Sequence, residues 1–263
     1  METNDTIKQK WFKCLLGARD NARPIDSLGA TVGEVSTEEA YDIQAMLVED
    51  RLQKGEQIIG WKVGATSLSI MNQLKITEPI LGCMTSGSYY PLLKGVKASD
   101  FCKLAVEGEI AFIMGKNLRG PGITKSDTIT ATAGVMGAVE LVDCRIKDWK
   151  PSLTEAVADN SLHAGIVLGS SMKSIIGFDL TKEGVILRKN GALLASACGV
   201  EALGDPVNVV TWLANKLSQL GREIRKGEVI LTGSLTEFCF VGPGDVVDVT
   251  FTSLGNIQFA VRK

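Results

Sequence analysis

Short β-type runs separated by turn residues dominate the chain from about residue 80 onward. Each run is rich in Val, Ile, Leu or Phe and is bounded by Gly, Pro, Asn or Asp, which is typical of strands joined by tight connections. The predicted strands span residues 104–114, 136–142, 164–169, 184–188, 193–200, 228–232 and 245–262. Because the regular strand–helix alternation of a Rossmann or TIM fold is missing, we expect a β-rich main domain.

The first part of the chain has a different pattern, with apolar residues at helical spacing over residues 5–19. Ser36-Thr-Glu-Glu39 fits a capping box, which predicts a helix from Thr37 to Lys54. A strand is expected at 58–63, followed by a short helix that ends near Leu74. This part is therefore predicted to be mainly helical.

One more helix is predicted inside the β-rich region, opened by Asp205-Pro206 and ended by Gly221. The whole chain is thus expected to be an α+β protein. We predict a mainly helical N-terminal part over residues 1–78 and a β-rich catalytic domain over residues 79–263.

Composition excludes several classes of function. Lys plus Arg (28) nearly balances Asp plus Glu (30), and no basic stripe stands out, so nucleic acid is not an expected partner. No apolar run approaches the roughly 20 residues of a membrane helix, and the polar start Met1–Asp5 lacks the features of a secretory signal. The six cysteines are scattered without zinc spacing. We expect a soluble, cytoplasmic protein with reduced cysteines.

Two acids stand close together in the predicted strand 104–114. Period-two alternation places Glu107 and Glu109 on one face, which continues with the apolar Ala111. Paired carboxylates on such a face repel each other, and a cation would relieve the repulsion. Gly108 between them permits close packing on the opposite face. From this run alone, a metal site and an edge strand with solvated acids are both open interpretations.

A third acid, Glu140, interrupts the otherwise apolar strand 136–142. A buried, unpaired carboxylate is costly, so Glu140 requires a cation or a proton. Asp143 lies off that face near the strand end, where solvent exposure is the simpler interpretation. Three carboxylates without a His or Cys partner suit Mg²⁺ or Mn²⁺ better than zinc. We predict that Glu107, Glu109 and Glu140 bind a divalent cation.

Lys62 lies in the otherwise apolar strand that precedes a turn of small residues. A half-buried lysine can have its pKa lowered enough to exchange protons. The alternative is a lysine whose ammonium reaches solvent at a strand edge. Thr66 and Ser67 in the turn offer hydroxyls to a ligand, but they are also suited to cap the next helix.

The segment Val157-Ala-Asp-Asn-Ser161 either supplies polar groups to a site or is a plain helix-to-strand turn. The only histidine, His163, stands beside it. A lone histidine is a general base in some enzymes and structural in more of them, so its role stays open. Neither a Gly-x-Ser-x-Gly motif nor a P-loop occurs, and acyl-enzyme or phosphate chemistry is unsupported.

Five segments carry a resemblance to a known family when they are taken in order. They are Gly60-Trp-Lys-Val-Gly-Ala-Thr-Ser67, Val106-Glu-Gly-Glu-Ile-Ala111, Ala138-Val-Glu-Leu-Val-Asp143, Val157-Ala-Asp-Asn160 and Ile230-Leu-Thr-Gly-Ser234. Together they resemble the 2-oxopent-4-enoate hydratase and 4-oxalocrotonate decarboxylase family, which is related to fumarylacetoacetate hydrolases. Each segment is a weak signal alone, but five in the right order are specific.

The resemblance implies a mixed β-roll or sandwich of the fumarylacetoacetate hydrolase C-terminal type behind a helical N-terminal part. It also implies Mg²⁺ or Mn²⁺ at Glu107, Glu109 and Glu140, in agreement with the choice made from the residues. The catalytic residues that it implies are Lys62 and Asp159, and the substrate-binding residues are Thr66, Ser67, Asn160, Thr232 and Ser234. A homo-oligomer is expected, which in this family can associate with a pathway partner enzyme.

The activity implied is chemistry on a small 2-oxo acid, whose C1 carboxylate and C2 oxygen chelate the metal so that an enolate is stabilised. A hydratase would add water at C4 of 2-hydroxypenta-2,4-dienoate or a close analogue in aromatic meta-cleavage catabolism. A decarboxylase would release carbon dioxide from a 4-oxalocrotonate-type 2-oxo-3-enedioate. The third alternative is a non-catalytic partner subunit of such an enzyme.

Departures from the family pattern point in two directions. Many hydratases have Pro-Asp where this chain has Pro79-Ile80, whereas the decarboxylases tend to have Pro-Ile. The stretches Arg145–Trp149 and Thr211–Lys216 look more like the hydratase branch. The stretch Ser27–Val35 matches neither branch well. We predict a hydratase, with the decarboxylase as the alternative.

Overall fold

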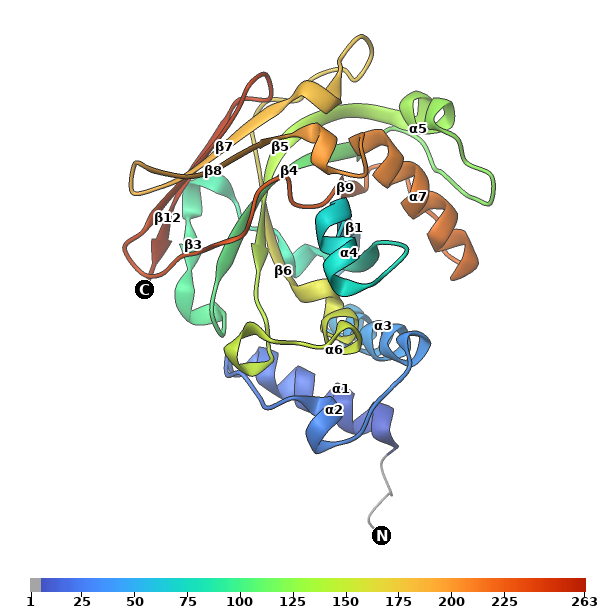
Figure 1. Cartoon of the computed structure of the whole chain (residues 1–263), viewed down its shortest axis with the longest axis vertical. Coiled ribbons are helices and arrows are strands. Elements are labelled where there is room, and N and C mark those ends of the chain that lie inside the picture. The colour runs from blue at the N-terminus through green and yellow to red at the C-terminus, as the bar shows by residue number, and fades with distance from the viewer. Residues whose placement is uncertain (1–5) are drawn as a thin grey trace.

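Two β-sheets packed face to face form the body of the protein, in a computed structural model that describes residues 6–263 (Figure 1). The larger sheet has the strand order β2 (Ile80–Thr85), β1 (Ile58–Gly64), β9 (Val229–Leu231), β4 (Ala105–Met114), β5 (Thr132–Val142) and β6 (His163–Leu168), and β10 (Cys239–Phe240) also pairs with β4. The smaller sheet has the order β3 (Val96–Lys97), β12 (Asn256–Arg262), β11 (Val246–Phe251), β7 (Gly184–Lys189) and β8 (Ala192–Cys198).

Glycines in the larger sheet allow the two sheets to approach closely. A Cβ atom added to Gly108 would lie 3.0 Å from Cγ2 of Val185 on β7 and 3.2 Å from Cγ1 of Val249 on β11. This contact confirms the close packing that the sequence predicted behind the two acids. The side chains of Glu107 and Glu109 lie on the other face of β4, away from the smaller sheet.

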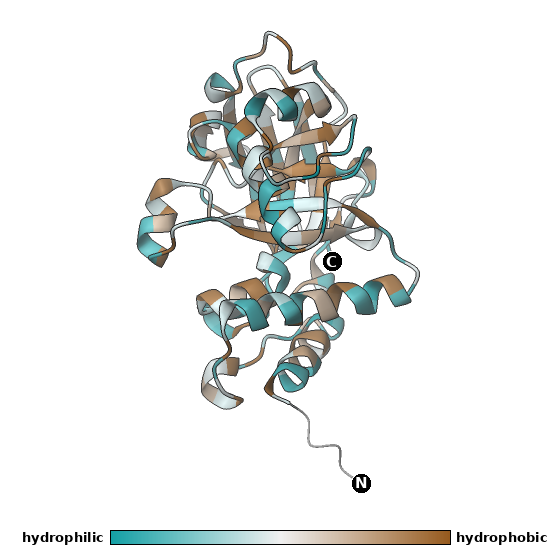
Figure 2. Ribbon diagram, turned by 90° about the vertical axis from the view of Figure 1, so that its right-hand side faces the viewer, coloured by the Kyte–Doolittle hydropathy of each residue, from teal (hydrophilic) through white to brown (hydrophobic). Residues whose placement is uncertain are grey.

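The N-terminal helices form an apolar cluster of their own at the opposite end of the molecule from the smaller sheet (Figures 1 and 2). The cluster joins α1 (Ile7–Asp20), α2 (Leu28–Thr31), α3 (Thr37–Gln53) and the later α6 (Leu153–Ala158). Three further helices, α4 (Leu68–Leu74), α5 (Lys125–Ala131) and α7 (Pro206–Gln219), lie around the larger sheet (Figure 1). Ile80 at the start of β2 packs against the helical cluster and so joins it to the sheet.

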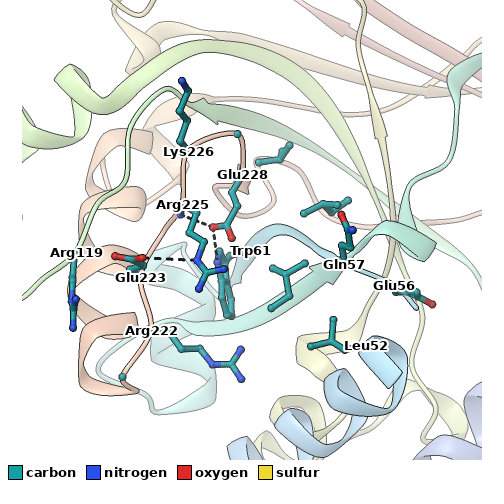
Figure 3. Close-up of a pocket in the computed structure, with 15 residues that line it drawn as sticks. Leu52, Glu56, Gln57, Trp61, Arg119, Arg222, Glu223, Arg225, Lys226 and Glu228 are labelled. Carbon is teal, nitrogen blue, oxygen red and sulfur yellow. Dashed lines mark hydrogen bonds and ion pairs between the residues drawn. The ribbon is translucent and has the colours of Figure 1, made fainter. Parts of the chain in front are cut away.

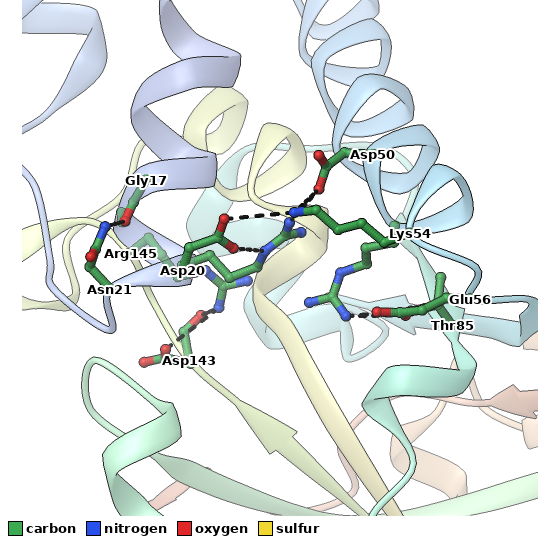
Figure 4. A network of polar contacts seen from close by, with 12 residues as sticks. Gly17, Asp20, Asn21, Asp50, Lys54, Glu56, Thr85, Asp143 and Arg145 are labelled. Carbon is green, nitrogen blue, oxygen red and sulfur yellow. Dashed lines mark hydrogen bonds and ion pairs between the residues drawn. The ribbon is translucent and has the colours of Figure 1, made fainter.

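Charged side chains also tie the helices together and to the sheet (Figure 4). Asp50 on α3 lies 3.2 Å from Arg19 on α1 and 2.9 Å from Lys54. Arg51 donates to Glu56 and to Thr85 at the end of β2, both at 3.5 Å. Partly exposed pairs of this kind contribute little each, so the apolar cluster supplies most of the attachment.

The predicted α+β architecture with a helical N-terminal part is confirmed. The Ser36 capping box opens α3 as expected, and Gly221 follows α7 with a φ of +70°. The run 245–262 is a hairpin of two strands, because Gly255 at φ +91° makes the turn between them. β2 was not predicted, since its six residues show no alternation of apolar and polar side chains.

The boundary between residues 78 and 79 stays a prediction, and β1, which lies before it, belongs to the larger sheet. The polar start Met1–Asp5 and the predicted helix start at Asp5 lie outside the described residues. Within residues 6–263, no helix has both the length and the apolar character needed to cross a membrane.

Gly137→Ala should destabilise the contact between the sheets, because the new Cβ would lie 2.5 Å from Cε2 of the buried Phe251 ring. Overpacking of this kind costs about 1–3 kcal/mol of unfolding free energy, measurable by urea denaturation. Gly242→Ala is the matched control, because nothing lies within 4 Å of its added Cβ. Equal stability of the two variants would contradict the close packing described above.

Candidate metal centre

The pairing of β4 with β5 brings the three predicted metal ligands together. Glu107 is directly opposite Glu140, and Glu109 is opposite Ala138. Residues directly opposite in an antiparallel pair have side chains on the same face. Each of the three acids places a carboxylate oxygen within 4.8 Å of the others.

The hydrogen bonds of the carboxylate oxygens show whether a cation would fit in this cluster. Glu109 Oε2 accepts from the Gly233 amide at 2.8 Å, and Glu140 Oε1 lies 2.8 Å from His163 Nδ1. Glu109 Oε1 is buried and has no hydrogen-bond partner among the described residues, and Glu140 Oε2 is buried with only the Lys62 ammonium, at 3.3 Å, beside it. Such atoms are costly to bury alone. A divalent cation would supply the missing partner, and an all-carboxylate donor set suits a hard cation.

The acids differ in their affinity for protons. Burial and the neighbouring Glu140 raise the pKa of Glu107 to about 8. Burial, followed by Glu140 and Glu107, raises the pKa of Glu109 well above its ordinary value. Burial also opposes ionisation of Glu140, but Lys62 and His163 outweigh it and lower the pKa of Glu140. Of the three acids, Glu140 is therefore the one whose ionised form the surrounding residues favour.

Lys62 lies on the same face of the sheet, since it pairs with Leu231, which pairs in turn with Ala111 of β4. Its side chain is buried, with Nζ 3.3 Å from Glu140 Oε2. The expected lowering of its pKa is wrong for the metal-free protein. Burial does lower the pKa of Lys62, but Glu140, Glu107 and Glu109 outweigh burial and raise it. The sequence did not show that all three acids surround this one amine.

A strained segment, the single turn Asn160–Leu162, faces Lys62. Asn160, Ser161 and Leu162 have φ values of +55°, +55° and +60°, which costs roughly 1–2 kcal/mol for each residue other than glycine. Lys62 Nζ donates to the Ser161 carbonyl at 2.9 Å. Ser161 Oγ is buried and has no hydrogen bond within residues 6–263. Strain of this kind persists where the surrounding structure enforces it, commonly at functional sites.

Three groups meet at Gly64 beside this strained turn. A Cβ atom on Gly64 would lie 3.0 Å from Ser161 Oγ, 3.2 Å from Lys62 Nζ and 3.5 Å from Ile80 Cγ1. Ile80, the residue that departs from many hydratases, is therefore close to the lysine. The position of the Ser161 hydroxyl could not be predicted, because serine is common in turns.

Asp159 and Asn160 have their polar groups engaged within the protein. Asp159 Oδ2 accepts from the Arg145 amide at 3.0 Å, and Oδ1 lies 2.7 Å from Arg145 Nε. Burial outweighs Arg145 and raises the pKa of Asp159 to about 6. The Asn160 side chain exchanges two hydrogen bonds of 2.8 Å with the backbone of Cys83. These contacts hold the strained turn in place, and the predicted contact of both residues with substrate stays a prediction.

The hydroxyls of the two predicted substrate-binding segments are also placed. Ser67 Oγ caps α4 by accepting from the Ile70 amide at 3.2 Å. Thr232 Oγ1 donates to the Ile110 carbonyl at 3.0 Å, and Ser234 Oγ donates to the Thr236 carbonyl. Thr66 is buried beneath Gly233, where an added Cβ would lie 2.1 Å from its hydroxyl oxygen. The group from these segments that contacts one of the three acids is the Gly233 backbone amide, which donates to Glu109.

His163 is a residue whose role the sequence analysis left open. It is buried, with Nδ1 on Glu140 and Nε2 3.2 Å from Ser88 Oγ. Burial lowers the pKa of His163 despite the opposing effect of Glu140. The pairing of Val142 with His163 places the imidazole on the face of the three acids. The pairing of β5 with β6 shifts register between Leu141 and Val142, so the sequence spacing alone did not reveal this position.

Asp143, in contrast, is not the solvated residue that was expected. It is buried, and its carboxylate accepts from the backbone amides of Cys102 at 2.9 Å and Lys103 at 2.8 Å. Arg145 Nη1 lies 3.8 Å from the same group (Figure 4). The expectation is wrong because the loop before β4 covers the end of β5, a long-range contact that a single strand pattern does not show.

A separate groove of about 1010 Å³ lies on the opposite face of β1 (Figure 3). Trp61 lines this groove, while the next residue, Lys62, points to the acids on the other face. Trp61 Nε1 donates to Glu228 at 3.1 Å, and exposed Arg222 lies over the indole ring. The predicted site residues are not among those that line it. Nothing in this groove adds to the metal centre.

Comparison with known proteins fixes the family. Residues 66–262 match the model described as fumarylacetoacetate (FAA) hydrolase C-terminal. The chain belongs to this family. A 2-hydroxypent-2,4-dienoate hydratase of Pseudomonas putida is 40% identical over 77% of this chain and 90% of its own. A 2-hydroxyhexa-2,4-dienoate hydratase of Comamonas testosteroni is 35% identical over 97% of both chains.

A solved structure is similar over the whole chain. The 4-oxalocrotonate decarboxylase from Pseudomonas putida G7, complexed with magnesium and adipate, has a TM-score of 0.92 and 29% identity, with 99% of both chains covered. The same protein has also been solved with calcium and acetate. The resemblance stated from the five sequence segments is thus confirmed, and the relatives on both branches are enzymes.

Magnesium should stabilise this protein more at pH 8 than at pH 6. The pKa of Glu107 is raised from 4.5 to about 8 in the folded state. The folded chain then holds a proton that the unfolded chain releases, and the metal-free protein loses stability as pH rises through this window. A cation replaces that proton, so the Mg²⁺-induced increase in Tm should grow with pH. Glu107→Gln should flatten the trend, and a trend independent of pH in the unmodified protein would contradict this linkage.

Proposed function

We propose that the protein is a metal-dependent hydratase that adds water to 2-hydroxypenta-2,4-dienoate or a close analogue. The observation that carries the proposal is the cluster of three carboxylates, two of them fully buried, beside Lys62 in a chain whose relatives at 33–40% identity are named hydratases of such dienoates. The same arrangement argues against a non-catalytic subunit, because a protein without activity has no need to maintain it.

The three acids would hold Mg²⁺ or Mn²⁺, which when bound supplies a Lewis acid for the oxygen at C2 of the substrate. The Gly233 amide and His163 each occupy one oxygen of a ligand acid and so fix the direction of the other. These two contacts orient the site before a ligand arrives.

Lys62 is the residue that we assign to proton transfer. Its ammonium is buried, hydrogen-bonded to the Ser161 carbonyl and held beside Glu140. Hydration of the dienol requires the proton on the C2 oxygen to be exchanged for one at C5, after which the hydroxyl of water adds at C4 and a proton adds at C3. The Lys62 ammonium can donate the proton to C5, and the resulting amine can take one from the C2 hydroxyl. The unpaired Ser161 hydroxyl next to it is available to orient the substrate or the water.

We also assign roles to Asp159 and to the remaining predicted site residues. Asp159 supports the Lys62 environment through Arg145, whose Nη2 donates to the His163 carbonyl at 3.2 Å. Thr66, Ser67, Asn160, Thr232 and Ser234 remain the proposed substrate-binding residues. A homo-oligomer in the cytoplasm, associated with a pathway partner enzyme, remains the expected assembly.

The second candidate is a 4-oxalocrotonate-type decarboxylase, and Ile80 favours it. Ile80 lies beside Lys62 and Ser161 at the position where many hydratases have aspartate. An apolar side chain there cannot activate water. The solved decarboxylase matches the whole fold, which adds to this alternative.

Incubation with Mg²⁺ and 2-hydroxypenta-2,4-dienoate should bleach the dienol absorbance and give 4-hydroxy-2-oxopentanoate. Parallel incubation with 4-oxalocrotonate, followed for carbon dioxide release, measures the second candidate. Carbon dioxide release without hydration would replace the hydratase with the decarboxylase. Absence of both reactions, together with an absence of Mg²⁺ binding by calorimetry, would leave the non-catalytic subunit.

Glu109→Gln should remove Mg²⁺ binding and turnover together while leaving the fold intact, because it keeps the volume but removes a ligand charge. The loss should exceed the roughly 10- to 100-fold that removal of an outer-shell partner costs. Lys62→Met should separate the two readouts, with turnover lost and Mg²⁺ binding retained. Glu201→Gln on the surface is the matched control. Normal activity in Glu109→Gln would refute the metal assignment.

A further inference from the structure

Three aromatic rings form a cluster that has no role in the hydration step proposed above. Trp149 lies 5.0 Å from Phe238 and 4.8 Å from Phe240, measured between ring centroids, and the two phenylalanines are 5.3 Å apart. We call these three residues the aromatic cluster. Phe238 is 47% exposed, while Trp149 and Phe240 are partly buried.

The aromatic cluster lies on the metal face of the sheet, next to the ligands. Phe240 pairs directly with Ala105 across β10 and β4, so the two side chains share a face. Ala105 stands two residues before Glu107, on the same face of the strand. Glu107 is therefore a diagonal neighbour of Phe240 across the two strands.

The segment that carries Phe238 and Phe240 follows β4 from one ligand to the other. The Gly233 amide binds Glu109, and the Leu235 amide then donates to the Gly108 carbonyl at 3.1 Å. Further along, the Val241 amide donates to the Leu104 carbonyl at 3.1 Å. The segment of Phe238 and Phe240 is thus attached to the same strand as the acids by hydrogen bonds on both sides of the two rings.

Trp149 is held in this cluster against its backbone preference. It lies in the single turn η4 (Lys147–Trp149), where Asp148 and Trp149 have φ values of +60° and +55°. A bulky residue at positive φ is a genuine outlier. The indole Nε1 is buried and has no hydrogen bond in the described part of the chain. Strain combined with an unpaired donor indicates a side chain placed for a ligand.

We propose that the aromatic cluster binds the distal end of the substrate and selects 2-oxo or 2-hydroxydienoic acids with an uncharged, apolar tail. This inference rests on the proposed function, because the metal centre fixes the head of the same molecule. A tail carboxylate would lose hydration against three rings without a built partner. The nearby Lys103 ammonium lies 3.9 Å from the Phe240 ring centroid and is on an exposed residue.

The affinities of unreactive 2-oxo acids separate the contribution of the substrate tail to binding from that of the metal-binding head. Calorimetry in Mg²⁺ should show that affinity rises from 2-oxobutanoate through 2-oxopentanoate to 2-oxohexanoate, by about fourfold for each methylene that reaches the rings. The dicarboxylate 2-oxohexanedioate should bind more weakly than 2-oxohexanoate by about tenfold or more. Oxalate, which has a head and no tail, gives the reference affinity.

Trp149→Ala and Phe238→Ala should each flatten the methylene series and leave the oxalate affinity within about twofold of the unmodified protein. Phe238 is partly exposed, so its variant tests the cluster even if loss of Trp149 prevents folding. Glu237→Ala, exposed in the same segment, is the matched control and should keep the full series.

Two outcomes would overturn the inference while leaving the metal centre intact. The first is normal oxalate binding with no dependence on tail length. The second is tighter binding of 2-oxohexanedioate than of 2-oxohexanoate, which would assign the tail to Lys103. Failure of oxalate itself to bind in Mg²⁺ has a different meaning, because it would remove the proposed function along with the inference.

Discussion

The pairing of Glu107 with Glu140 across β4 and β5 is the constraint on which the rest of the structure depends. Two carboxylates directly opposite each other destabilise a sheet when both are ionised, and here Glu140 is fully buried and Glu107 is half-buried. The protein counters this cost locally. Lys62 and His163 approach Glu140 from either side, and the Gly233 amide approaches Glu109. Each of these partners comes from a different segment of the chain.

That requirement explains features that lie far from the acids in sequence. The turn Asn160–Leu162 is forced into left-handed backbone so that the Ser161 carbonyl meets Lys62. Arg145 and Asp159 then anchor the turn, and Asn160 binds the backbone of β2. Gly108 allows the smaller sheet to support β4 from behind. The strain is local, while the interactions that maintain it come from both sheets and the helices.

The sequence was sufficient for features that depend on a single strand or helix. Alternation along β4 placed Glu107 and Glu109 on one face, and an acid within an apolar run identified Glu140. Contacts between segments were out of reach of that reasoning. The burial of Asp143 depends on the loop before β4, the environment of Lys62 depends on three strands, and His163 depends on an irregular register between β5 and β6. The resemblance to a family supplied the order of the segments, but not these distances.

The same geometry shows why the metal centre does not by itself decide the reaction. Stabilisation of charge at the C2 oxygen serves hydration and decarboxylation alike, so the choice must come from groups farther along the substrate. The structure has two such groups. Ile80 reduces the polarity near Lys62, and the aromatic cluster disfavours a second carboxylate at the tail. A decarboxylase of a 2-oxo-3-enedioate must accommodate that second carboxylate, whereas a hydratase of an apolar dienoate need not. The tail contacts therefore weigh toward hydration even though Ile80 alone weighs against it.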